Sequence, residues 1–171
     1  MSVLNMVLYP DDPLSQVAEP FAKVGPEVVK LAQDMLETMD TYEGIGLAGP
    51  QVGVSKRIFV LREPDGPKMC LINPEILEVD GCEEGEEGCL SLPRIYTEVQ
   101  RATWIKVRAL DVYGKRHEFE AEDLLARIIQ HENDHLDGVI FLDRVDVLKR
   151  QEKLQEWEEV RGRMMAALGG G

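Results

Sequence analysis

The chain contains few histidines and cysteines, three of each among 171 residues. Cys70, Cys82 and Cys89 are an odd number, and the first residues carry no cationic run that would indicate a secretory signal or a transit peptide. A reduced, cytoplasmic protein is therefore expected, in which a cysteine is buried, reactive or metal-bound rather than bridged. No apolar run approaches the roughly 20 residues that span a bilayer, so no membrane association is expected.

A basic tail or patch is also missing. Lysine and arginine number 19 against 32 aspartate and glutamate residues, which gives a net charge of −13. This balance disfavours binding to DNA or to an anionic membrane surface. The chain has no internal repeat, linker or second core, so residues 1–171 are expected to form a single catalytic domain.

Apolar periodicity predicts an α+β fold, with mostly antiparallel sheets around a central buried helix and with an N-terminal and a C-terminal helix. Helices are expected over residues 26–40, 123–136 and about 143–168. Strands are expected at 57–62, 69–73, 75–79 and 97–113, with 116–122 as a hairpin partner. The glycine-rich segment 43–53 and the acidic segment around 82–89 are expected to be loops.

The helix expected from Asp123 to Leu136 is apolar over most of its circumference and should lie deep in the domain. One stripe of this helix consists of Leu124, Ile128, His131 and His135. Arg127 and Asp134 belong to the polar remainder on the opposite side, where an Asp123–Arg127 pair would be surface support.

The segment "QHENDHLDG" (130–138) contains the pattern His131-Glu132-x-x-His135. Residues four apart on a helix point the same way, so both imidazoles can bind one metal ion, while Glu132 can serve a bound water without being a ligand. The third ligand must come from elsewhere. Cys89 would complete a Cys-His-His set with a fourth position free for water, and a downstream glutamate at 152, 156, 158 or 159 is the alternative.

Three short motifs make the chain resemble the bacterial peptide deformylases. They are "GIGLAGPQ" (44–51), "EGCLS" (87–91) and "QHENDH" (130–135), in the order of that family. The family usually has alanine where this chain has Gly49, a small-for-small difference. The strand "RATWIKVRALD" and the helical C-terminus are also similar, so the resemblance covers most of the domain.

The resemblance implies a ligand set of Cys89, His131 and His135 for one divalent metal ion. The ion is commonly Fe(II), and Ni(II), Co(II) or Zn(II) can substitute. The substrate is the N-terminal formyl-methionine of newly synthesised proteins, and the products are formate and a free amine. The resemblance further implies that a metal-bound water attacks the formyl carbon, with Glu132 acting first as general base and then as general acid.

The same resemblance assigns an oxyanion site to the side-chain amide of Gln51 and the backbone N–H of Leu90. Gly44 and Gly46 flank Ile45 in a segment that could pair with a peptide like an added strand, although an ordinary tight turn is the alternative. The expected substrate-binding set is Gly44, Ile45, Gly46, Glu87, Leu124 and Ile128, with His131 closing the methionine pocket. Arg101 is a candidate to orient Asp134 or the cysteine segment.

Three further expectations complete the hypothesis. Members of the family act at the ribosome near the exit tunnel and dock there through the C-terminal helix; the mixed charge of residues 144–163 leaves that contact open here. Cys70 is expected to be a core residue, and Cys82 a free surface thiol or else a second ligand or disulfide partner. A zincin-like peptidase and a metal-bound binding module without activity are the alternative functions.

Overall fold

The computed structural model describes residues 2–169 and confirms the α+β class. Its helices are α1 (Pro26–Thr41), α2 (Asp123–Leu136) and α3 (Val147–Gly169), with short 3-10 helices η1 (Asp12–Ser15), η2 (Gly49–Val52) and η3 (Phe141–Arg144). The strands are β1 (Gly46–Ala48), β2 (Ile58–Leu61), β3 (Met69–Asp80), β4 (Glu83–Cys89), β5 (Leu92–Arg101), β6 (Trp104–Leu110) and β7 (Arg116–Glu122). Among residues 2–169, no helix combines the length and the apolar character that a membrane crossing requires.

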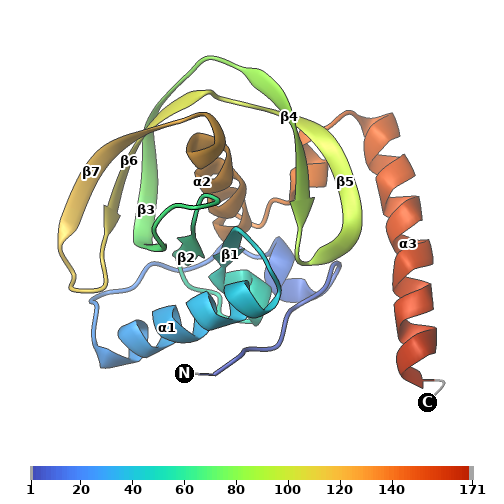
Figure 1. The fold of residues 1–171 in the computed structure, drawn as a ribbon, viewed down its shortest axis with the longest axis horizontal. Helices are drawn as coiled ribbons and strands as arrows, with labels where there is room; N and C mark the ends of the chain where they lie inside the picture. Colours follow the sequence, from blue (N-terminus) through green and yellow to red (C-terminus); the bar gives the residue numbers. More distant parts are fainter. Residues whose placement is uncertain (1, 170–171) are drawn as a thin grey trace.

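Helix α2 lies in the middle of the molecule, between two antiparallel sheets (Figure 1). One sheet has five strands in the order β1-β2-β3-β6-β7, and the other is the β4-β5 pair. Helix α1 covers the outer side of the first sheet, and α3 packs along β5 at the edge of the molecule. The predicted central buried helix is therefore confirmed.

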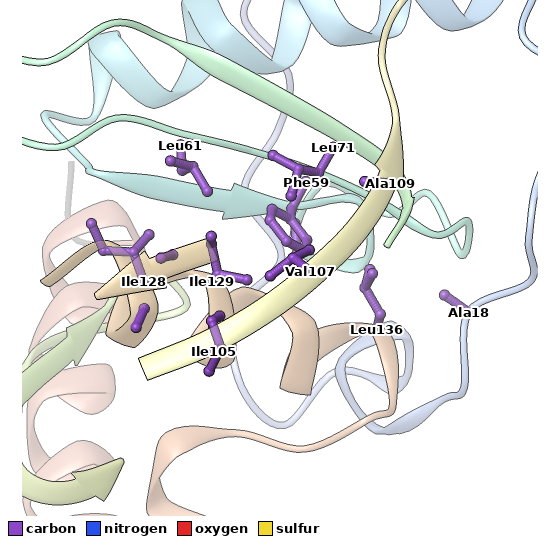
Figure 2. Close-up of a cluster of buried hydrophobic side chains, with 13 residues drawn as sticks. Ala18, Phe59, Leu61, Leu71, Ile105, Val107, Ala109, Ile128, Ile129 and Leu136 are labelled. Carbon is purple, nitrogen blue, oxygen red and sulfur yellow. The ribbon is translucent and has the colours of Figure 1, made fainter. Parts of the chain in front are cut away.

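Strand β2 is buried along its whole length because both faces of its sheet are covered. Ile58 and Val60 belong to the cluster that includes α1, whereas Phe59 and Leu61 point to the opposite face. Figure 2 shows Ile129 of α2 beside the strand residues of this second cluster. Ile128, Ile129 and Leu136 of α2 thus anchor the helix on the sheet.

Strand β5 alternates between buried and exposed residues and presents its buried side to η3 and α3. Trp157 of α3 is fully buried in this third cluster, and its indole N–H donates to the carbonyl of Tyr9 at 3.0 Å. This contact fastens α3 to the domain and to the N-terminal segment.

The prediction of one continuous strand over residues 97–113 is wrong, because this segment contains parts of two separate strands, β5 and β6, which belong to different sheets. The backbone of Ala102, between them, pairs with a side chain instead of a strand. Its N–H donates to Gln130 Oε1 at 3.1 Å, and its carbonyl accepts from Gln130 Nε2 at 2.9 Å. Gln130 of α2 therefore interrupts the strand between β5 and β6. Apolar alternation within residues 97–113 cannot indicate such a break, because it depends on a side chain from another element.

Four other segments differ from the expectation. The glycine-rich segment 43–53, expected as a loop, contains strand β1, which pairs with β2, and the 3-10 helix η2. The segments 69–73 and 75–79 form one strand, β3, whose pairing with β6 shifts register after Ile72. The acidic segment expected as a loop is strand β4, paired along its length with β5. The C-terminal helix begins at Val147 rather than near 143, because η3 precedes it and the Asp146 carboxylate accepts the N–H of Lys149.

Candidate metal centre

The three predicted ligand residues meet at the junction of α2 and the end of β4. One ligand atom from each of Cys89, His131 and His135 lies within 4.8 Å of the other two. Cys89 Sγ is 3.4 Å from His135 Nε2, and both histidines are buried. The alternative ligands, the glutamates of α3, are not part of this group. One donor set is thus formed by two histidines one helical turn apart and by Cys89, which lies 42 positions before His131.

The imidazole of His131 is held by a buried carboxylate. His131 Nδ1 lies 2.8 Å from Glu87 Oε1, which leaves Nε2 for the donor group. Burial alone would raise the pKa of Glu87, but hydrogen bonds from Arg101 and His131 outweigh it and lower the pKa to about 2. A carboxylate behind a ligand histidine fixes the ring and its tautomer. Glu87 also lines the cavity described below. Its expected contact with the substrate is compatible with that position and stays a prediction.

The expected surface role of Arg127 is wrong. Arg127 forms no ion pair with Asp123 within the described part of the chain; instead Nη1 donates to Glu87 at 2.8 Å and to the carbonyl of Val99 at 2.8 Å. Its Nη2 donates to the carbonyl of Glu83 at 2.7 Å. Arg127 therefore ties α2 to both strands of the β4-β5 pair, which covers the side of the helix expected to face solvent.

Asp134, also expected on the polar side, is buried between two arginines. Arg101 Nη1 donates to Asp134 at 2.6 Å, and Arg101 also makes two hydrogen bonds to Glu87, at 2.8 and 2.9 Å. Arg101 thus contacts both Asp134 and the segment that ends at Cys89, and its orienting role stays a prediction. Arg144, which was not predicted, makes a second pair of hydrogen bonds to Asp134.

Glu132 is buried beside the donor group. Its Oε2 is 3.9 Å from His131 Nε2, and its Oε1 has no hydrogen-bond partner within the described residues. Burial raises the pKa of Glu132 to about 7. Gly46 of β1 makes room for this side chain, since a Cβ at that position would lie 2.4 Å from Glu132 Oε2. A carboxyl group with such a pKa can take up and release a proton near neutral pH.

Gln51 is oriented by the backbone of its own turn. Its Oε1 accepts the N–H of Ala48 at 2.9 Å, so its Nε2 points to Ser91 Oγ at 3.3 Å and to Cys89 Sγ at 3.5 Å. The side chain is 1% exposed. Gln51 therefore points an N–H toward the three candidate metal ligands, as a role in stabilising an oxyanion requires.

A cavity of about 620 Å³ opens onto the group. Every predicted catalytic and substrate-binding residue lines it, as do Cys89 and His131, whereas the fully buried His135 lies behind them. Its further lining residues, which were not predicted, include Met6, Leu8, Tyr42, Tyr96 and Met164. They come from the N-terminal segment, from the end of α1, from β5 and from α3. Tyr42 and Tyr96 are among the exposed large side chains, a signal visible only in the folded protein.

The remaining histidine and cysteines lie away from the centre. Cys70 and Cys82 are free thiols, half-buried and exposed respectively, so the disulfide alternative for Cys82 is wrong. Cys82 is also absent from the donor group. Burial raises the pKa of Cys70 to about 12. His117 lies on β7, where its Nε2 is 2.6 Å from Asp111 Oδ2.

A half-buried cysteine and two buried histidines able to hold a metal ion, with a glutamate beside them at the wall of a cavity, are the parts of a hydrolytic enzyme's active site. Comparison with known proteins narrows the class. The chain belongs to the polypeptide deformylase family, whose model matches residues 3–151. It is therefore an enzyme of the kind that removes N-formyl groups from nascent polypeptides.

Individual relatives agree along nearly the whole chain. The peptide deformylase of Alkalilimnicola ehrlichii is 45% identical over 173 residues, which cover 99% of this chain and 97% of the relative. That of Nitrosococcus oceani is 46% identical over 168 residues, covering 97% and 100%. The crystal structure of peptide deformylase from Ehrlichia chaffeensis superposes with a TM-score of 0.91 at 36% identity, covering 96% of this chain and 99% of that one.

Proposed function

We propose that the chain removes the formyl group from the N-terminal formyl-methionine of new proteins. It does so with one divalent metal ion, preferentially Fe(II), held by Cys89, His131 and His135. Ni(II), Co(II) or Zn(II) would substitute. The observation that carries this proposal is the approach of the three donor atoms to within 4.8 Å of one another, beside Glu132. Formate and a free amine are the products.

The donor set fits such an ion. A thiolate and two imidazoles suit Fe(II), Ni(II), Co(II) and Zn(II), whereas Mg²⁺ and Ca²⁺ prefer oxygen ligands. No fourth protein donor joins the group among residues 2–169, which is typical of a catalytic rather than a structural site. When bound, the ion would supply a Lewis acid that polarises the formyl oxygen and lowers the pKa of a water molecule.

Glu132 supplies the proton transfers. It takes a proton from the water that attacks the formyl carbon, and it returns the proton to the nitrogen as the carbon–nitrogen bond breaks. Its burial and its pKa of about 7 support both steps. Glu132 lies beside His131 without belonging to the donor group, so it stays free to move a proton.

Two donors stabilise the oxyanion that forms on the formyl oxygen. Gln51 Nε2 is held toward the site because Gln51 Oε1 already accepts the N–H of Ala48. The backbone N–H of Leu90 follows directly after Cys89 in the same wall of the cavity. Removing one such donor typically lowers the rate by about 10²–10³-fold.

The peptide would bind along β1 as an added strand. Strand β1 is at the edge of the five-stranded sheet, so one side of its backbone faces the cavity rather than another strand of that sheet. Gly44, Ile45 and Gly46 would provide that edge. Leu124 and Ile128 of α2, with His131, would line the pocket for the methionine side chain.

The ligand and base roles are separated by two variants. Glu132→Ala should keep one bound metal ion per chain but lose turnover, whereas Cys89→Ala should lose or weaken metal binding. Metal content by elemental analysis and formate release from a formyl-Met peptide measure the two effects. If Glu132→Ala retains most of its activity, its role as base is wrong.

The substrate is tested with formyl-Met, acetyl-Met and unblocked peptides, by measuring new amines. Release from the formyl peptide alone is expected. Cleavage inside an unblocked peptide would indicate a peptidase instead, and no product from any peptide would favour a binding module. Action in the cytoplasm and at the ribosome near the exit tunnel are further parts of the proposal, and co-sedimentation of the full chain with ribosomes tests the second.

A further inference from the structure

We propose that Arg144, at the end of η3, is a positioning residue for the deformylase reaction. It acts on His131 through three buried side chains, Asp134, Arg101 and Glu87. This inference rests on the proposed function, because it assigns the chain of contacts to holding His131 as a metal ligand. It goes beyond that function by placing a control point outside the catalytic cavity.

The contacts form one continuous chain with alternating charges. Arg144 makes a two-pronged contact with Asp134, with Nε 3.0 Å from Oδ2 and Nη2 2.7 Å from Oδ1. Arg101 joins Asp134 to Glu87, and Glu87 Oε1 lies 2.8 Å from His131 Nδ1. The side chains of Arg101, Asp134 and Glu87 are each less than 10% exposed. Charged hydrogen bonds in such surroundings are strong and geometrically specific.

Within this series of contacts, Arg144 is the one residue that reaches the surface, with a side chain 50% exposed. Nevertheless it is the only side-chain partner of Asp134 Oδ1 among the described residues. Its removal would leave a buried carboxylate oxygen without a partner, which favours rotation of the carboxylate or entry of water. Arg101 would then lose the fixed anion that holds its Nη1, and its contact with Glu87 would loosen.

The same short helix also contacts His131 directly. The ring of Phe141, the first residue of η3, has its centroid 5.9 Å from that of His131. Phe141 is 1% exposed and packs in the cluster that contains Trp157 of α3. Helix η3 therefore fixes the ring of His131 by packing and its Nδ1 by the chain that starts at Arg144.

A second restraint limits the size of the effect. Arg127 also donates to Glu87, at 2.8 Å, so the carboxylate keeps one guanidinium partner when Arg101 shifts. We therefore expect the loss of Arg144 to weaken metal retention by about tenfold, the low end of the range for removing an outer-shell partner of a metal ligand.

The test uses the full chain loaded with Co(II), whose visible absorption bands report the geometry of the ligands. Arg144→Ala should shift these bands and speed Co(II) loss to a chelator by about tenfold. Its kcat should fall while KM is retained, because the peptide-binding edge is untouched. Arg144→Lys should give an intermediate result, since an ammonium cannot reproduce the two-pronged contact. Arg163→Ala, which removes a guanidinium whose side chain is 73% exposed on α3, is the matched control and should behave as wild type.

The proposal would be overturned if Arg144→Ala shows unshifted absorption bands and a rate of Co(II) loss within about twofold of wild type. A lower melting temperature with unchanged bands would overturn it too, because it would show a purely structural role. If Arg144→Ala does not fold, Arg144→Lys decides in the same way. Failure of the wild-type chain to bind Co(II), or retention of Co(II) by Cys89→Ala, would instead refute the metal site itself.

Discussion

Replacing Gly46 by alanine is expected to disable the enzyme without removing the metal ion. The new Cβ would lie 2.4 Å from Glu132 Oε2 and 2.9 Å from its Cδ, whereas ordinary contacts begin near 3.4 Å. Strand β1 is held by its ladder with β2, in which Gly46 is opposite Leu61, so Glu132 rather than the backbone must move. The carboxylate would shift by about 1 Å, and a misplacement of that size can lower a rate by about 10²-fold.

The assay is formate release from a formyl-Met peptide, with kcat, KM and metal content measured on the same preparations. Gly46→Ala should lose about 10²-fold in kcat and keep one metal ion per chain. Gly162→Ala is the control, because a Cβ there has no atom within 4 Å. It should keep full activity and raise the free energy of unfolding by roughly 0.5–1 kcal/mol, since alanine favours a helix over glycine. A Gly46→Ala enzyme with a kcat within about twofold of wild type would refute the assigned position of Glu132.

Three further predictions concern other parts of the molecule. Glu87→Gln should weaken metal affinity by about 10–100-fold in a chelator competition, because a neutral amide holds His131 less firmly; unchanged affinity would show that Glu87 does not orient the ligand. At pH 8, iodoacetamide should modify exposed Cys82 and spare Cys70, whose pKa burial raises to about 12, so that almost no thiolate is present. Equal labelling of the two, measured by mass spectrometry of the folded protein, would contradict that environment. Trp157→Ala should lower the free energy of unfolding by about 3–5 kcal/mol in urea titrations, because a fully buried indole and its hydrogen bond are lost; a loss below about 1 kcal/mol would mean that α3 is not anchored there.

The parts of the site that the sequence predicts are those set by local geometry. Helical periodicity places His131 and His135 on one side of α2, and the structure confirms both the helix and its burial. The hairpin of β6 and β7 follows from alternation and a turn at Gly114 in the same way. Residue chemistry leaves Cys89 and a downstream glutamate as alternatives for the third ligand. The resemblance to the deformylases selects Cys89, which joins the donor group.

The parts that the sequence misses depend on which distant element covers a surface. Arg127 and Asp134 lie on the polar side of α2, and a helix considered alone leaves that side in water. The β4-β5 pair and η3 cover it, so these charges form the buried contacts around Glu87. Strand β4 itself has no apolar alternation, since its residues are mainly glutamate and glycine, and only its ladder with β5 makes it a strand.

Formate release during titration of the metal-free chain with Fe(II) under anaerobic conditions tests the proposed metal centre most directly. The three-donor group predicts no activity after chelation, a linear rise with added ion and a plateau at one ion per chain. Cys89→Ala should show no such saturation in the same range. Full activity in the chelated wild-type protein, or a plateau that Cys89→Ala reaches equally well, would contradict a metal centre built from Cys89, His131 and His135.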